Sequence, residues 1–187
     1  MRKTIFLILI LLHSWVTVSL AEENDFRNTK WGMALAEVKE INEATILSQD
    51  KNELVYSTVL FNKKCNLYYH FENNKLVIGG MSFNNDNELD SNDKDILYNK
   101  INTLLSDKYE KKKDNKINES YTDKMDLSID KKALSEEIDK IASVLKGCDF
   151  SIYESKNSII MLIRHNQITV EYIDKKFFIR QNEYYQF

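Results

Sequence analysis

The chain has 187 residues, of which 43% are hydrophobic, and its formal net charge at pH 7 is −3. This length and hydrophobic content are sufficient for one domain with a substantial core. The mild acidity argues against a nucleic-acid-binding protein, because affinity for the phosphate backbone depends on a dense basic patch.

The N-terminus has the pattern of a secretory signal peptide. Arg2 and Lys3 precede an apolar run over residues 4–18, and Ser19-Leu20-Ala21 has the small residues of a cleavage site. The run is shorter than the roughly 20 residues that span a bilayer as a helix. We therefore expect cleavage after residue 21, leaving a mature domain of residues 22–187 in the periplasm or secreted further. An uncleaved signal anchor is the alternative.

The mature chain is expected to be more acidic than the precursor. Because Arg2 and Lys3 leave with the signal, 24 basic side chains face 29 acidic ones, a net charge of −5. The lysine-rich residues 108–116 are interleaved with Asp and Glu, which indicates a solvated helix end and not a binding patch. We expect no nucleic-acid partner and no membrane span after signal cleavage.

Cys65 and Cys148 are the only cysteines. An even number of cysteines in an exported chain predicts a disulfide, which would close a loop of about 80 residues and stabilise the fold by a few kcal/mol. The alternative is two separate thiols, each packed as a small hydrophobic side chain.

The first half of the mature chain reads as a helix followed by three strands. Residues 33–42 have helical spacing, and residues 53–61, 65–71 and 75–83 are strand-like. In the middle strand the apolar and polar positions alternate: Cys65, Leu67, Tyr69 and Phe71 share one side, and Asn66, Tyr68 and His70 share the other. Asn73-Asn74 predicts a two-residue hairpin turn, since Asn tolerates positive φ.

The second half reads as two helices followed by strands. Asp130 resembles an N-cap, and Gly147 lies where a helix is expected to end. Residues 111–129 are ambiguous, with either a strand near 117–121 or an exposed excursion. The predicted elements are helices at 93–109 and 131–146, then strands at 149–153, 158–164, 168–173 and 176–180. This order predicts an α+β fold, a mostly antiparallel sheet with the helices packed on one face.

The segment Asp25-Phe26-Arg27-Asn28-Thr29-Lys30-Trp31-Gly32-Met33 resembles the opening of a group of uncharacterised exported bacterial proteins, which share a Phe-Arg-x-Thr-x-Trp-Gly-Met signature. The turn at Asn73-Asn74-Lys75-Leu76 is similar to that group's meander. The helix-then-meander order is similar to the fold of the β-lactamase inhibitory protein and of a small outer-membrane assembly lipoprotein. The resemblance implies a binding module and not an enzyme. It assigns no binding residue, because the shared positions, Trp31 among them, look structural.

No motif for catalysis, a cofactor or a metal is found in the sequence. A zinc site from Cys65, His70, Cys148 and His165 is disfavoured, because Cys65 and His70 are an odd number of residues apart on one strand and point to opposite faces. We expect an interaction module of the bacterial envelope, without cofactor or enzymatic activity. Its predicted contact surface is Tyr68, His70 and Glu72, and its partner another envelope protein. The alternative is a periplasmic hydrolase that uses a carboxylate site without a recognisable motif.

Overall fold

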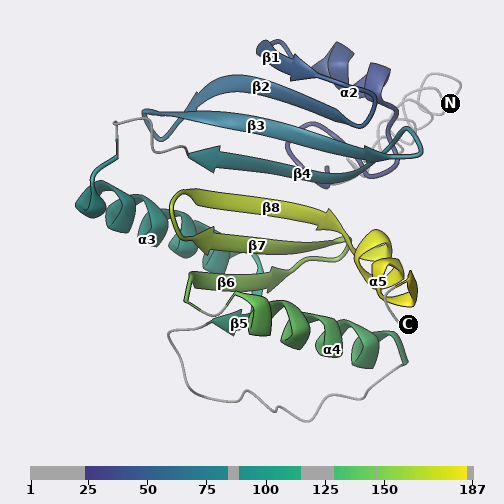
Figure 1. The fold of residues 1–187 in the computed structure, drawn as a ribbon, viewed down its shortest axis with the longest axis vertical. Coiled ribbons are helices and arrows are strands. Elements are labelled where there is room, and N and C mark those ends of the chain that lie inside the picture. Colours follow the sequence, from purple (N-terminus) through teal and green to yellow (C-terminus); the bar gives the residue numbers. More distant parts are fainter. Residues whose placement is uncertain (1–23, 84–88, 115–128, 146, 185–187) are drawn as a thin grey trace, which may run out of the picture.

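The structure, a computed structural model, describes residues 24–83, 89–114, 129–145 and 147–184, with the backbone alone for residues 129–133 and 181–184. Eight strands in these ranges form one antiparallel sheet in the order β1-β2-β3-β4-β8-β7-β6-β5 (Figure 1). The strands are β1 Thr45–Gln49, β2 Glu53–Leu60, β3 Lys63–Glu72, β4 Lys75–Phe83, β5 Glu110–Asp114, β6 Asp149–Glu154, β7 Ser158–Arg164 and β8 Ile168–Asp174. The helices are α2 Leu35–Ile41, α3 Ser91–Lys108, α4 Ile129–Val144 and α5 Lys175–Tyr184. The α+β class with a dominant antiparallel sheet agrees with the prediction.

Two tight turns connect the central meander. Asn73 and Asn74 have φ angles of 51° and 58° between β3 and β4, which confirms the predicted hairpin turn. Phe61 and Asn62 have φ angles of 54° and 61° between β2 and β3. Two successive residues with positive φ match the right-handed twist of the strands that they join.

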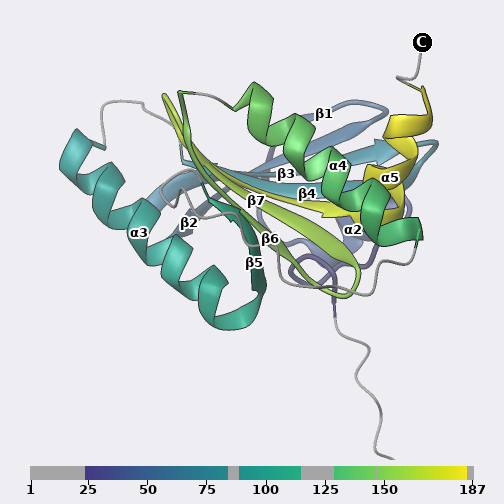
Figure 2. The same ribbon diagram turned by 90° about the horizontal axis from the view of Figure 1, so that it is seen from below.

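Helices cover both faces of the sheet, so the prediction of helices on one face is wrong (Figure 2). In β7, Ile160 and Leu162 pack in the cluster that contains the buried side of α3. The alternate residues Ile159 and Met161 pack with α4 and α5. Since successive strand residues point to opposite faces, α3 lies on one side of the sheet and α4 on the other. We call these the α3 side, which also carries α2, and the α4 side, which also carries α5.

The sheet has an internal two-fold arrangement about the pairing of β4 with β8. Each half begins with a helix on the α3 side and continues into a five-residue edge strand. In both edge strands the pairing register skips the third residue, Leu47 in β1 and Lys112 in β5. The pairs correspond as far as the register shift after His70, which the second half lacks: Ile46↔Tyr56 matches Lys111↔Tyr153, Val55↔Tyr68 matches Ile152↔Met161, and Tyr68↔Gly80 matches Met161↔Glu171. Gly80 and Glu171 are themselves paired across the centre.

Two adjacent glycines in β4 allow an aromatic ring to lie against each face of the sheet. A Cβ on Gly79 would lie 2.1 Å from the ring of Phe26, and a Cβ on Gly80 would lie 2.3 Å from the ring of Tyr68. Phe26 is 2% exposed and belongs to the core on the α3 side. No other residue type leaves room for both rings.

The first described residues form a clasp between the two halves. The carboxylate of Asp25 accepts hydrogen bonds from the Trp31 backbone at 2.9 Å and from the Asn157 side chain at 2.8 Å. The indole of Trp31 donates to the Ser158 hydroxyl at 3.1 Å. Trp31 therefore has a structural role, since it also packs against the core of the first half.

Three elements differ from the sequence prediction. β1 and β5 were not predicted, and the final element is the helix α5, where residues 176–180 were expected to form a strand. Asp174 precedes α5 and its side chain accepts a hydrogen bond from the Lys176 backbone at 2.9 Å, as an N-cap does. The strand considered near residues 117–121 lies outside the described residues. Gly147, with φ of 92°, lies just past α4 as predicted.

Candidate functional site

The three residues predicted to form a contact surface lie on β3. Tyr68, His70 and Glu72 alternate along this strand and share the α4 side, and their exposure increases from Tyr68 to Glu72. The register places Val55 of β2 beside Tyr68, and Glu53 beside His70. The structure therefore brings the predicted residues onto one surface.

Tyr68 lies along the sheet and does not project from it. Its ring crosses Gly80, and its hydroxyl donates a hydrogen bond of 2.8 Å to Glu171 of β8. Burial raises the pKa of Tyr68 above its ordinary value, and the carboxylates of Glu171 and Glu53 raise it further. The phenol is therefore neutral and acts as a hydrogen-bond donor. The sequence could not identify Glu171 as its partner, because 103 residues separate the two.

His70 and Glu72 also border a hollow at one end of the sheet. The hollow lies between the β1–β2 turn, the β3–β4 turn and α5, and its volume is about 410 Å³. Its lining residues are Lys51, Asn52, His70, Phe71, Glu72, Asn73 and Phe177. The imidazole of His70, the ammonium group of Lys51 and the carboxylate of Glu72 can form hydrogen bonds with a partner protein that covers the hollow.

The surface around Tyr68 and His70 is exposed, whereas the same side of the sheet is covered by helices in the second half. Figure 1 shows α4 along β6 and β5 and α5 at the ends of β7 and β8, and no described helix crosses in front of β2 and β3. We call this surface the open face. It consists of Glu53, Val55, Ser57 and Val59 of β2 and Lys64, Asn66, Tyr68 and His70 of β3, which are all partly or fully exposed.

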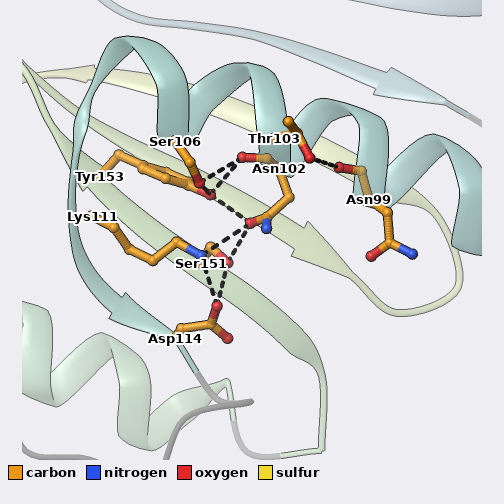
Figure 3. A network of polar contacts seen from close by, with 8 residues as sticks. All are labelled: Asn99, Asn102, Thr103, Ser106, Lys111, Asp114, Ser151 and Tyr153. Atoms are coloured by element: carbon orange, nitrogen blue, oxygen red, sulfur yellow. Dashed lines mark hydrogen bonds and ion pairs between the residues drawn. The ribbon is translucent and has the colours of Figure 1, made fainter.

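A buried polar network lies on the other side, between α3 and the strands β5 and β6 (Figure 3). The side-chain oxygen of Asn102 accepts hydrogen bonds from the hydroxyls of Tyr153, at 2.5 Å, and Ser151, at 2.8 Å. Lys111 donates to Asp114 at 2.9 Å, and this bond raises the pKa of Lys111 although burial alone lowers it. Ser151 and Tyr153 are fully buried.

This network was missed by the sequence prediction. Lys111 and Asp114 belong to a charged run that reads as solvent-exposed, and Asn102 lies in a helix with an apolar stripe. The network joins α3 to the edge strand β5, and the hydroxyls of Ser151 and Tyr153 both donate hydrogen bonds to the side chain of Asn102. We interpret it as a structural contact, because buried polar groups require partners and these supply one another.

Ion pairs hold the α4 side of the second half. Lys112 approaches the carboxylate of Glu154 to 3.0 Å, and Lys175 at the start of α5 binds the same carboxylate. Burial raises the pKa of Glu154, but the two ammonium groups outweigh it, so the pKa lies below its ordinary value. On the α3 side, Arg164 bridges Asp95 of α3 and Asp149 of β6.

The prediction of a disulfide between Cys65 and Cys148 is wrong, since the structure has no bond between them. Cys65 is buried in β3, and Cys148 directly precedes β6. Four strand spacings separate β3 from β6 in the sheet, a distance of about 19 Å at about 4.8 Å per strand. A disulfide requires Cα atoms less than about 7 Å apart.

Within the described ranges no group of three or more His, Cys, Asp or Glu side chains is arranged to hold a metal ion. No helix in the same ranges is both long and apolar enough to cross a membrane. No family model, no curated protein and no solved structure matches this chain.

Proposed function

We propose that this chain is an exported binding module of the bacterial envelope, and that the open face holds another protein. The observation that carries the proposal is the contrast between the two halves of one sheet. The α4 side is covered by helices in the second half and open over β2 and β3 in the first. The predicted signal peptide supports the export of the chain.

The composition of the open face supports a reversible protein contact. Val55 and Tyr68 are half-buried apolar or aromatic side chains at its centre, and Val59 is 62% exposed near one end. Glu53, Asn66 and His70 surround them with groups that donate or accept hydrogen bonds. An apolar centre with a polar rim is the anatomy of non-obligate interfaces.

The edges of the sheet are poor binding sites by comparison. β1 and β5 each have five residues, and each is interrupted by a bulge at its third residue. Short, bulged edge strands resist the addition of a further strand. The hydrolase alternative would require a second carboxylate beside Glu72 in the hollow, and Glu72 is the one carboxylate among the described residues that line it.

Site-specific photocrosslinking in envelope fractions tests this proposal. A photoreactive amino acid at Val59 on the open face is expected to give an adduct with another protein. The matched control is Thr103, which is exposed on α3, on the far side of the sheet. Absence of an adduct from Val59, or equal adducts from both positions, contradicts the proposal.

A further inference from the structure

The internal two-fold arrangement relates the open face to the seat of α4. α4 belongs to the connection between β5 and β6, and Leu134 and Ile138 of this helix are buried in the cluster on the α4 side. The equivalent connection in the first half, between β1 and β2, has only residues 50–52. The first half therefore has the strands of the seat but no helix of its own to cover them.

The register identifies the residues of the open face that correspond to the seat of α4. Two positions stay apolar or aromatic: Val55 corresponds to Ile152, and Tyr68 corresponds to Met161. Three positions exchange an apolar side chain for a polar one. Phe150, Ile159 and Ile163 of the second half correspond to Glu53, Asn66 and His70 of the first half, respectively.

This exchange has a definite physical consequence. In the second half, α4 packs together with α5 on a continuous apolar seat, and burial of that seat stabilises the contact by roughly 25 cal/mol per Å² of apolar area. The equivalent seat in the first half keeps its apolar centre and has a polar rim. A helix placed on the first-half seat buries less apolar area and leaves the rim groups accessible for hydrogen bonds. Its binding is therefore reversible.

We propose that the open face accepts one amphipathic helix of the partner protein, laid over β2 and β3 as α4 is laid over β6 and β7. The helix carries a narrow apolar stripe that contacts Val55 and Tyr68. Polar side chains on its flanks meet Glu53, Asn66 and His70. This inference rests on the proposed function and specifies the form of the partner.

Mapping of photocrosslinks distinguishes this inference from the proposed function. Photoreactive residues at Val59, Asn66 and His70 are expected to react with one segment of the partner, at positions three, four or seven residues apart, which is the spacing of one helix face. Adducts at alternate residues would indicate an extended segment, and scattered adducts a loop surface. Both results overturn the helix while leaving the binding module intact. No adduct from any open-face position removes both.

A second experiment tests the seat without knowledge of the partner. The triple variant Glu53→Phe, Asn66→Ile and His70→Ile copies the α4 seat onto the open face. A synthetic peptide of α4, Ile129–Val144, is expected to bind this variant at least 10-fold more tightly than the unmodified chain, measured by fluorescence anisotropy. Equal binding to both proteins overturns the equivalence of the two seats. If the triple variant does not fold, the single variant Asn66→Ile is expected to give a smaller increase in the same assay.

Discussion

Gly79 and Gly80 provide a sharp test of the packing, because they are neighbours in β4 and face opposite sides of the sheet. In the variant Gly79→Ala the new methyl group meets Phe26, which is 2% exposed and enclosed by the core. Overpacking at the upper end of its usual range costs about 3 kcal/mol. The loss of backbone freedom in the unfolded chain offsets about 1 kcal/mol. We expect the free energy of unfolding to fall by about 2 kcal/mol.

Gly80→Ala is the matched control. Its methyl group meets Tyr68, which lies on the open face and can turn outward. The loss is the hydrogen bond to Glu171, about 1.5 kcal/mol at a half-exposed position. The same gain of about 1 kcal/mol from the unfolded chain offsets most of it. We therefore expect a change below about 1 kcal/mol.

Urea unfolding of residues 22–187, followed by the fluorescence of Trp31, measures both variants as a shift of midpoint at constant slope. A double-mutant cycle adds a second criterion. Phe26→Leu is expected to couple with Gly79→Ala by about 1 kcal/mol, and to be additive with Gly80→Ala within about 0.5 kcal/mol. The reasoning is refuted if Gly80→Ala destabilises as much as Gly79→Ala, or if neither pair is coupled.

Three further predictions concern the second half and the cysteines. Because the pKa of Glu154 is lowered in the folded state, its ion pairs stabilise the fold above about pH 4.5, and this stabilisation is lost as the pH falls through the folded pKa. In the variant Glu154→Gln, the melting temperature should therefore fall less steeply with decreasing pH, which thermal unfolding at a series of pH values measures. Asn102→Ala removes the acceptor of two buried hydroxyls and should cost about 3 kcal/mol. The exposed Asn99→Ala should change the stability by less than about 0.5 kcal/mol, and equal losses in the two variants would contradict the network. Alkylation of the unfolded chain without reductant should label both Cys65 and Cys148; an unlabelled pair would restore the disulfide.

The meander could be predicted because its residues report directly on burial. The alternation in β3 gave its buried face, and Asn73-Asn74 gave its turn. β1 and β5 could not be predicted in this way, because an edge strand with five exposed residues, or a charged one, has no apolar face. The helices on both faces did leave a signal: residues 159–163 are all apolar, a pattern typical of strands buried on both sides.

The contact surface was predicted in part for a similar reason. The periodicity of β3 places Tyr68 and His70 on one face, and this depends only on neighbouring residues. The partner of Tyr68 and the space over Gly80 depend on which strands are adjacent in the sheet. The strand order also explains why the disulfide prediction was wrong. The count of cysteines favours a pair, but the order of the strands in the sheet separates Cys65 from Cys148.

The clasp formed by Asp25 and Trp31 determines how the molecule comes apart. The first segment of the chain is bonded to Asn157 and Ser158 in the far half, so separating β4 from β8 does not release either half. The two halves, although built alike, are therefore expected to unfold as one cooperative unit. Amide hydrogens in β3 and β7 should then exchange with solvent at the same global rate, and Asp25→Ala should be the change that lets the first half open by itself.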